Sequence, residues 1–242
     1  MNGCLLIHGL TGTPATVSVV RNALLASGFK VAAPCLAGHG GSVDELARSG
    51  WRDWYDTVRI AFQTLRRETE RVYCAGISLG ALLALKLALD EGWGVRALAL
   101  MATPLELSWP TRAALSIVRH SPLRWGIFKV PKNLDQSVAD PEGRMRYSEL
   151  SLPAIPASSA FELSDLQKEI RGQLSSLSNP ILMLHGQGDL VAPIRNVELI
   201  KGMVASDIVE KMILPRSRHV ITMDYEKDQV AKAVVDFFKK FA

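Results

Sequence analysis

Short apolar runs alternate along the chain with longer stretches in which apolar residues recur every three or four positions. The short runs are typical of buried parallel strands, and the longer stretches are typical of helices that cover such a sheet. The runs that predict strands are Cys4 to Ile7, Phe29 to Pro34, Arg71 to Ala75, Val95 to Met101, Pro180 to Leu184 and Ile208 to Leu214. The stretches that predict helices are Pro14 to Ser27, Trp51 to Thr69, Leu79 to Glu91, Val191 to Met203 and Asp224 to Phe241. The alternation predicts an α/β fold, with a mostly parallel six-stranded sheet flanked by helices.

One long segment interrupts the alternation. Residues 103–179 contain most of the prolines of the chain and no run typical of a buried strand. A structureless loop of that length between two core strands would be unusual, so we expect a few helices that form a lid over the site. The predicted organisation is a core made of residues 1–102 and 180–242, with a helical lid or cap insertion at 103–179.

The stretch Gly76-Ile77-Ser78-Leu79-Gly80 links a predicted strand to a predicted helix. A serine on such a sharp turn needs small neighbours, because the strained backbone brings other elements close, and the turn lifts the hydroxyl above the sheet. Ser78 is therefore a candidate nucleophile. Glycine and serine are common residues, so the pattern alone leaves an ordinary turn open as the alternative.

A serine nucleophile needs a base and a group that orients the base, and both follow later strands. Asp189 comes just after the run Pro180 to Leu184, and His219 comes shortly after Ile208 to Leu214. Taken singly, Asp189 could simply begin a turn or cap a helix, and His219 is more often a solvated loop histidine. Their position beyond strand ends, in the order serine, aspartate, histidine, favours a catalytic triad.

Hydrolysis also needs backbone N–H groups that bind the oxyanion. Leu79 follows the candidate nucleophile at a predicted helix N-terminus, where its N–H is free and the helix dipole favours an anion. Leu10 lies in His8-Gly9-Leu10-Thr11-Gly12, directly after the first predicted strand. A plain glycine-rich turn remains the simpler interpretation of this loop, and it does not exclude the functional one.

Several motifs together resemble those of one large family, the α/β-hydrolases, and within it the compact bacterial carboxylesterases and monoacylglycerol lipases. They are His8-Gly9-Leu10-Thr11-Gly12, Gly38-His39-Gly40, Gly76-Ile77-Ser78-Leu79-Gly80, Gly188-Asp189 and Ser217-Arg218-His219-Val220-Ile221-Thr222-Met223-Asp224. The resemblance spans nearly the whole chain and implies a serine carboxylesterase with Ser78, Asp189 and His219 as its triad. It also implies Leu10 and Leu79 as oxyanion donors. One departure is Leu10, where close relatives often carry Phe.

The lid segment is rich in apolar side chains, which predicts an apolar cavity and an ester substrate with an uncharged, apolar portion. Short to medium acyl esters and monoacylglycerols fit this description. The residues expected at the substrate are Leu10, Trp109, Trp125, Phe128, Val191 and Val220, although packing of the lid onto the core is the simpler role for any lid residue. Thioesterase, lactonase, carbon–carbon bond hydrolase and haloperoxidase chemistry remain alternatives on this fold, as does a non-catalytic ligand-binding module.

Composition and charge limit the kinds of partner and cofactor that we expect the chain to bind. The net charge of +4 comes from scattered basic residues, so we expect no nucleic-acid groove. No metal-ligand spacing or phosphate-binding glycine pattern is found, which predicts no metal and no cofactor.

Cys4, Cys35 and Cys74 lie in or beside apolar runs, which predicts buried thiols in a reducing compartment. Because the first residues show no secretion signal and no run reaches membrane-spanning length, we expect a cytoplasmic enzyme without stable membrane anchoring.

Overall fold

The computed structural model describes residues 1–121 and 129–242, and its centre is a six-stranded sheet. The strands are β1 (Asn2–Ile7), β2 (Lys30–Ala32), β3 (Arg71–Ile77), β4 (Val95–Met101), β7 (Ile181–Gly186) and β8 (Val209–Leu214). They lie in the order β2-β1-β3-β4-β7-β8, and every neighbouring pair is parallel. The predicted parallel sheet of six strands is confirmed.

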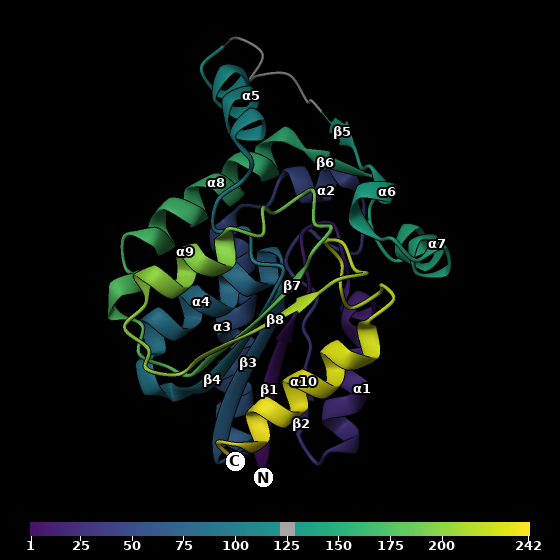
Figure 1. Cartoon of the computed structure of the whole chain (residues 1–242). Helices are drawn as coiled ribbons and strands as arrows, with labels where there is room; N and C mark the ends of the chain where they lie inside the picture. The colour runs from purple at the N-terminus through teal and green to yellow at the C-terminus, as the bar shows by residue number, and fades with distance from the viewer. Residues whose placement is uncertain (122–128) are drawn as a thin grey trace.

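Helices cover both faces of this sheet (Figure 1). The helices α1 (Ser18–Ala26) and α10 (Lys227–Lys239) pack together on one face, and α3 (Trp51–Glu68), α4 (Leu79–Glu91) and α9 (Asn196–Met203) lie on the other. Alternate side chains of β1 enter the two cores: Leu5 and Ile7 pack on the side of α3 and α4, whereas Cys4 and Leu6 pack on the side of α1 and α10. Burial on both faces explains why the strands read as continuous apolar runs.

Some element boundaries differ from the sequence prediction. The first predicted helix begins with a 3-10 turn, η1 (Pro14–Val17), and a short helix, α2 (Val43–Ala47), was not predicted. Helix α9 begins at Asn196 rather than Val191, because the chain from Val191 to Pro193 forms a turn around Asp189. The predicted burial is wrong for Cys35, which is exposed, because β2 ends at Ala32 and leaves this residue in a loop.

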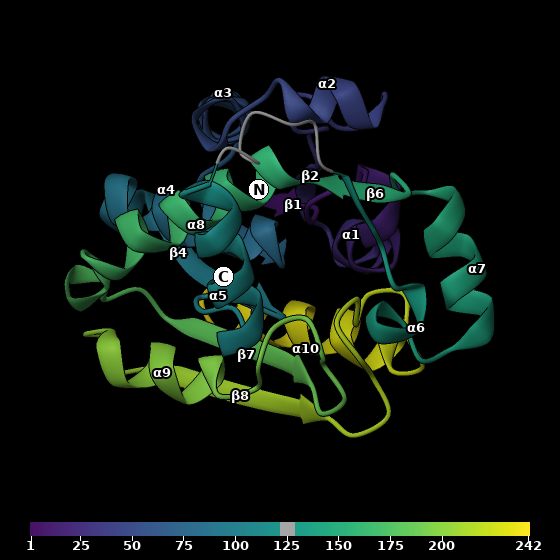
Figure 2. The same cartoon turned by 90° about the horizontal axis from the view of Figure 1, so that it is seen from above.

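The segment between β4 and β7 is mainly helical, as its sequence predicts. It contains α5 (Trp109–Arg119), α6 (Leu134–Ser137), α7 (Pro141–Glu149), α8 (Ala157–Arg171) and the 3-10 turn η4 (Leu174–Ser176). It also contains a small antiparallel pair, β5 (Lys129–Pro131) and β6 (Ala154–Pro156), whose strands are too short to show an alternating pattern. Helix α8 packs on α3 and α4, whereas α5, α6 and α7 lie beyond the carboxyl ends of the strands (Figures 1 and 2). The role of residues 103–179 as a lid stays a prediction.

Within the described part of the chain, no helix combines the length and the apolar character that a bilayer span requires.

Candidate active site

Ser78 stands on a strained turn between β3 and α4. Its backbone has φ 56° and ψ −120°, a conformation that few residues other than glycine adopt. A Cβ added at Gly76 would overlap the backbone oxygen of Gly80, and one added at Gly80 would overlap the backbone oxygen of Ile7. The turn therefore closes only with glycine at both positions, which is the physical reason for the pattern that the sequence shows.

Gly80→Ala is expected to destabilise the protein by about 1–3 kcal/mol or more, because the clash is with rigid backbone and not with a flexible side chain. Urea unfolding measures this change directly. Gly202→Ala is the matched control, since the position lies in α9 and an added Cβ there meets no atom within 4 Å. An equal effect of both substitutions would contradict the steric account of the turn.

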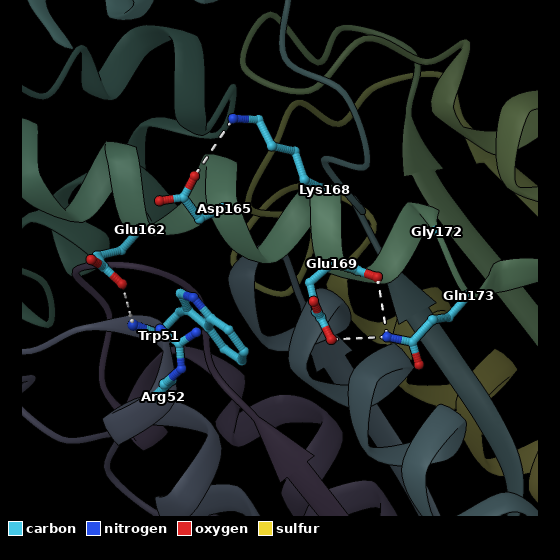
Figure 3. A pocket seen from close by; sticks show the side chains of 8 residues that line it. All are labelled: Trp51, Arg52, Glu162, Asp165, Lys168, Glu169, Gly172 and Gln173. Carbon is cyan, nitrogen blue, oxygen red and sulfur yellow. Dashed lines mark hydrogen bonds and ion pairs between the residues drawn. The ribbon is translucent and has the colours of Figure 1, made fainter.

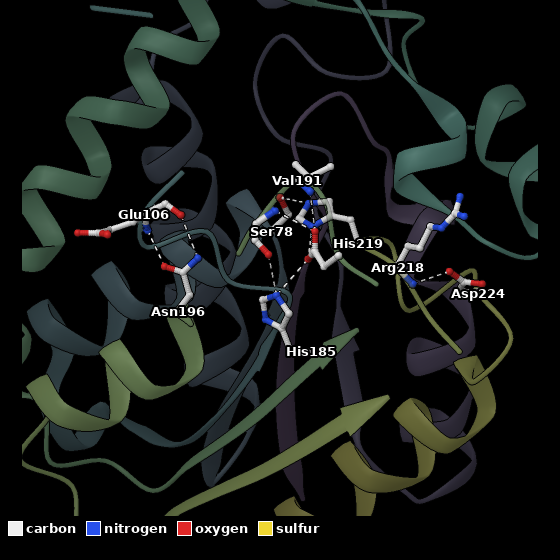
Figure 4. A network of polar contacts seen from close by, with 10 residues as sticks. Ser78, Glu106, His185, Val191, Asn196, Arg218, His219 and Asp224 are labelled. Atoms are coloured by element: carbon white, nitrogen blue, oxygen red, sulfur yellow. Dashed lines mark hydrogen bonds and ion pairs between the residues drawn. The ribbon is translucent and has the colours of Figure 1, made fainter. Parts of the chain in front are cut away.

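Three loops bring Ser78, Asp189 and His219 together at the carboxyl ends of β3, β7 and β8. Figure 4 shows Ser78 and His219 side by side. The Oγ of Ser78 lies 2.9 Å from Nε2 of His219, and Nδ1 of His219 lies 2.8 Å from Oδ2 of Asp189. In the neutral imidazole this chain is satisfied when the serine hydroxyl donates to Nε2 and Nδ1–H donates to the carboxylate. Asp189 and His219 are buried, whereas Ser78 is partly exposed, so the hydroxyl is the member that a substrate can reach.

The carboxylate of Asp189 has four hydrogen-bond donors around it. Its Oδ1 accepts the backbone N–H groups of Val191 and Ala192, each at 2.8 Å, and its Oδ2 lies 3.1 Å from Nε2 of His185 as well as near His219. Burial raises the pKa of Asp189, but the charges and hydrogen bonds of His219 and His185 outweigh it and hold the pKa well below its usual range. The group is therefore an anion at neutral pH.

The contact of His185 with this carboxylate was not predicted from the sequence. Nε2 of His185 also lies 3.0 Å from the backbone oxygen of Ala192. The signal available in the sequence was the spacing of four residues to Asp189, across a turn with Gly186 and Gly188. Asp189 begins a turn and also contacts the ring of His219, and its part in a catalytic triad stays a prediction.

The two predicted oxyanion donors lie beside the serine. Leu79 is the first residue of α4, so its N–H has no partner within the helix. A Cβ added at Gly9 would lie 3.3 Å from Cβ of Ser78, which places the Leu10 loop next to the candidate nucleophile. Neither N–H donates to another group in the part of the chain that the structure describes. Their oxyanion role stays a prediction that this geometry supports.

A buried histidine fastens the Leu10 loop to the rest of the core. Nδ1 of His8 lies 2.9 Å from the backbone oxygen of Gly9, and Nε2 accepts the backbone N–H of Leu36 at 3.1 Å. The ring also packs edge-on against that of His39, with 5.1 Å between centroids. Burial, and then the neighbouring His39, lower the pKa of His8 to about 3, so the ring stays neutral.

This neutral ring predicts that the protein loses stability in acid. The unfolded chain protonates His8 near pH 6.5, whereas the folded state resists protonation down to a pKa of about 3. The unfolded state therefore binds more protons between these values, and stability falls by about 1.4 kcal/mol per pH unit as the pH drops through this window. Urea unfolding at several pH values measures the slope. His8→Asn keeps a donor and an acceptor but cannot titrate, so it should flatten the slope; an unchanged slope would contradict the assignment.

Two buried carboxylates hold the loop that carries His219. Asp224 is fully buried and accepts the backbone N–H groups of Arg218, Tyr225, Ala139 and Asp140 at 2.8–2.9 Å. Glu226 accepts the backbone N–H of Arg216 at 3.1 Å and the hydroxyl of Ser217 at 2.6 Å. These contacts give a structural reason for the acidic end of the motif around His219, a role that sequence reasoning missed.

The predicted substrate residues differ in their surroundings. Val191 is half-buried beside Asp189, and Leu10 is half-buried at the edge of the α3 and α4 core. Val220 is buried in the other core, and Trp109 is 70% exposed at the start of α5. Trp125 and Phe128 lie outside the described residues. Substrate contact by these side chains stays a prediction.

A groove of about 520 Å³ lies elsewhere, between the start of α3 and α8 (Figure 3). Its lining residues are mostly polar: Trp51, Arg52, Glu162, Asp165, Lys168, Glu169, Gly172 and Gln173. Neither Ser78 nor His219 nor Asp189 lines it, so the groove is separate from the candidate active site. Among the described residues, no three His, Cys, Asp or Glu side chains converge as a metal site requires.

A parallel sheet with a serine on a strand-to-helix turn, and with an aspartate and a histidine beyond later strands, defines an α/β-hydrolase. The family model described as serine aminopeptidase, S33, matches residues 2–226. The chain belongs to this family, which agrees with the resemblance that its motifs show.

Known proteins similar to this chain include lipases and esterases. The thermostable monoacylglycerol lipase of Bacillus sp. (strain H-257) is 27% identical over 240 residues, which cover 99% of this chain and 91% of that protein. A carboxylesterase of Bacillus subtilis (strain 168) is 26% identical over 237 residues, covering 98% and 92% of the two chains. A solved structure from work on the metagenome-derived lipolytic enzymes LipS and LipT superposes with a TM-score of 0.88 at 26% identity, covering 99% and 94%.

Proposed function

We propose that this chain is a serine hydrolase that cleaves carboxylic esters with an uncharged, apolar portion, such as short to medium acyl esters or monoacylglycerols. The observation that carries the proposal is the continuous hydrogen-bonded chain from Ser78 through His219 to Asp189. The N–H groups of Leu10 and Leu79 beside the serine have no partner among the described residues. The similarity over nearly the whole chain to a monoacylglycerol lipase and a carboxylesterase supports ester hydrolysis over other chemistry on this fold.

Each residue has a defined part in the proposed mechanism. His219 accepts the proton of Ser78 as the oxygen attacks the ester carbonyl, and Asp189 holds Nδ1–H and stabilises the imidazolium. The N–H groups of Leu10 and Leu79 bind the oxyanion, and loss of one such donor typically costs about 2.7–4 kcal/mol. His219 then protonates the departing alcohol. A water molecule activated by the same histidine hydrolyses the acyl-enzyme, so the kinetics are ping-pong.

The proposed setting is the cytoplasm, with a small-molecule ester as the partner. The thiols of Cys4 and Cys74 are free and fully buried, which fits a reducing compartment. We propose that the protein binds no nucleic acid and is not stably anchored to a membrane. The protein detected in the soluble fraction of its own cells would support this setting, whereas recovery from the extracellular medium would contradict it.

A substrate series tests the proposed chemistry. p-Nitrophenyl esters from acetate to palmitate and a monoacylglycerol series are compared with acyl-thioesters, lactones and an amino-acyl anilide, the last because the family description names an aminopeptidase. We expect the highest kcat/KM for short or medium acyl esters or for monoacylglycerols. Faster cleavage of the thioester, lactone or anilide would replace this proposal with the corresponding activity.

A further inference from the structure

One oxygen of the triad carboxylate contacts two imidazoles. Oδ2 of Asp189 lies 2.8 Å from Nδ1 of His219 and 3.1 Å from Nε2 of His185 (Figure 4). His185 is the fifth residue of β7 and is 1% exposed, so it approaches the carboxylate from within the sheet, whereas His219 approaches from the loop after β8. Asp189 therefore contacts a second, buried histidine in addition to His219.

The contacts of His185 define where its proton lies. Nε2 faces the backbone oxygen of Ala192 at 3.0 Å and the carboxylate oxygen of Asp189 at 3.1 Å, and both of these groups only accept hydrogen bonds. Nε2 must therefore carry a hydrogen and share it between the two oxygens. The buried ring of His185, held in this tautomer, donates to Oδ2 of Asp189. The same oxygen accepts the hydrogen bond from Nδ1–H of His219.

We propose that His185 is a positioning residue for the triad, an inference that rests on the proposed function. The two backbone N–H groups anchor only Oδ1 of Asp189, which leaves the carboxylate free to turn about that point. The N–H of His185 holds Oδ2 in the plane that His219 needs. It also withdraws negative charge from Oδ2, so the imidazolium of His219 is stabilised less than a lone carboxylate would stabilise it.

The carboxylates that follow His219 have partners of their own. Asp224 accepts the backbone N–H of Arg218, the residue before His219. Asp224 accepts four backbone N–H groups, and Glu226 accepts a backbone N–H and a hydroxyl. Within the described chain, His185 and His219 are thus the ionisable side chains that share the Asp189 carboxylate.

The experiment compares His185→Leu, which removes the donor, with His185→Gln, which keeps an N–H. Met183→Leu is the control, because Met183 lies on the same face of β7 as His185 and is buried in the core beside α3 and α4. For His185→Leu we expect kcat to fall about 10- to 100-fold, the loss typical of a hydrogen bond to a charged group. We also expect the acidic limb of the kcat/KM profile to move to higher pH. His185→Gln should recover most of kcat and return the limb towards its wild-type position.

The outcomes separate this inference from the proposed function. Covalent labelling of Ser78 by a fluorophosphonate, measured on each variant, reports whether the serine hydrolase assignment holds. If labelling and ester turnover are present and His185→Leu leaves kcat and the limb unchanged, His185 merely fills space and the inference is wrong. If His185→Leu does not fold, His185→Met serves as the donor-free variant. A kcat and a limb within the range of Met183→Leu then overturn the inference, and a limb at higher pH that His185→Gln restores supports it.

Discussion

Ser78→Ala is expected to leave a folded protein whose ester hydrolysis is at least about 10⁴-fold slower than that of the wild type. The reason is chemical, since alanine offers no oxygen that His219 can activate, and the acyl-enzyme cannot form. The strain at this position does not require the hydroxyl, because Ser78 owes its φ of 56° to the tight turn between β3 and α4. Measurement of kcat/KM for a p-nitrophenyl ester, beside thermal unfolding, separates lost chemistry from lost structure.

Ser148→Ala provides the matched control for this loss. Ser148 is an exposed serine on α7 whose hydroxyl donates to the backbone oxygen of Met145, and no part of the proposed mechanism uses it. Its removal should leave kcat/KM within about twofold, as expected for a surface position. Retention of substantial activity by Ser78→Ala would mean that a different residue attacks the ester. Unfolding of that variant would point to a structural role for the hydroxyl instead.

The features predicted from the sequence depend on local patterns. Strands such as β1 and β3 are buried on both faces, so their apolar runs stand out, and the glycines around Ser78 reflect clashes that only glycine avoids. The convergence of the three candidate triad residues follows from topology, because the carboxyl ends of parallel strands share one edge of the sheet.

The features that escaped prediction depend on contacts between distant segments. The carboxylate of Asp224 binds N–H groups of Ala139 and Asp140, which lie 85 and 84 positions away, and no local pattern reveals such a partner. The donor from His185 to Asp189 spans only four residues, but its direction depends on a turn with two glycines. The predicted start of α9 lay too early in the chain. The backbone N–H groups of Val191 and Ala192 bind the carboxylate of Asp189, so these residues form a turn and not the first turn of the helix.

These distant contacts join the segment before α7 to the loop that carries the proposed base. The backbone N–H of Val220, the residue after His219, donates to the backbone oxygen of Ser137 at 2.8 Å. A Cβ added at Gly143 on α7 would overlap the backbone oxygen of Met223. Together with the bonds made by Asp224, these contacts make the position of His219 depend on residues of the predicted lid as well as on the core.

Asp224→Ala is therefore expected to cost several kcal/mol of stability and to lower kcat at the same time. Four backbone N–H groups around the buried carboxylate would lose their acceptor, and each polar group left buried without a partner costs about 1–3 kcal/mol before any rearrangement or entry of water. The loop next to His219 would lose its attachment at Arg218, so the imidazole would sample positions out of reach of Ser78. Urea unfolding and kcat/KM for a p-nitrophenyl ester measure the two effects.

Asp228→Ala is the control for Asp224, because this aspartate lies exposed in the first turn of α10 and should contribute only about 0.3–1 kcal/mol through the helix dipole. Asp224→Asn tests whether the four N–H groups need both oxygens of a carboxylate as acceptors. Its amide nitrogen would face N–H groups that need an acceptor, so it should recover only part of the loss. Fluorophosphonate labelling of Ser78 should slow in step with kcat, since both require His219 in place. Wild-type stability and turnover in Asp224→Ala would show that the His219 loop keeps its conformation without this carboxylate.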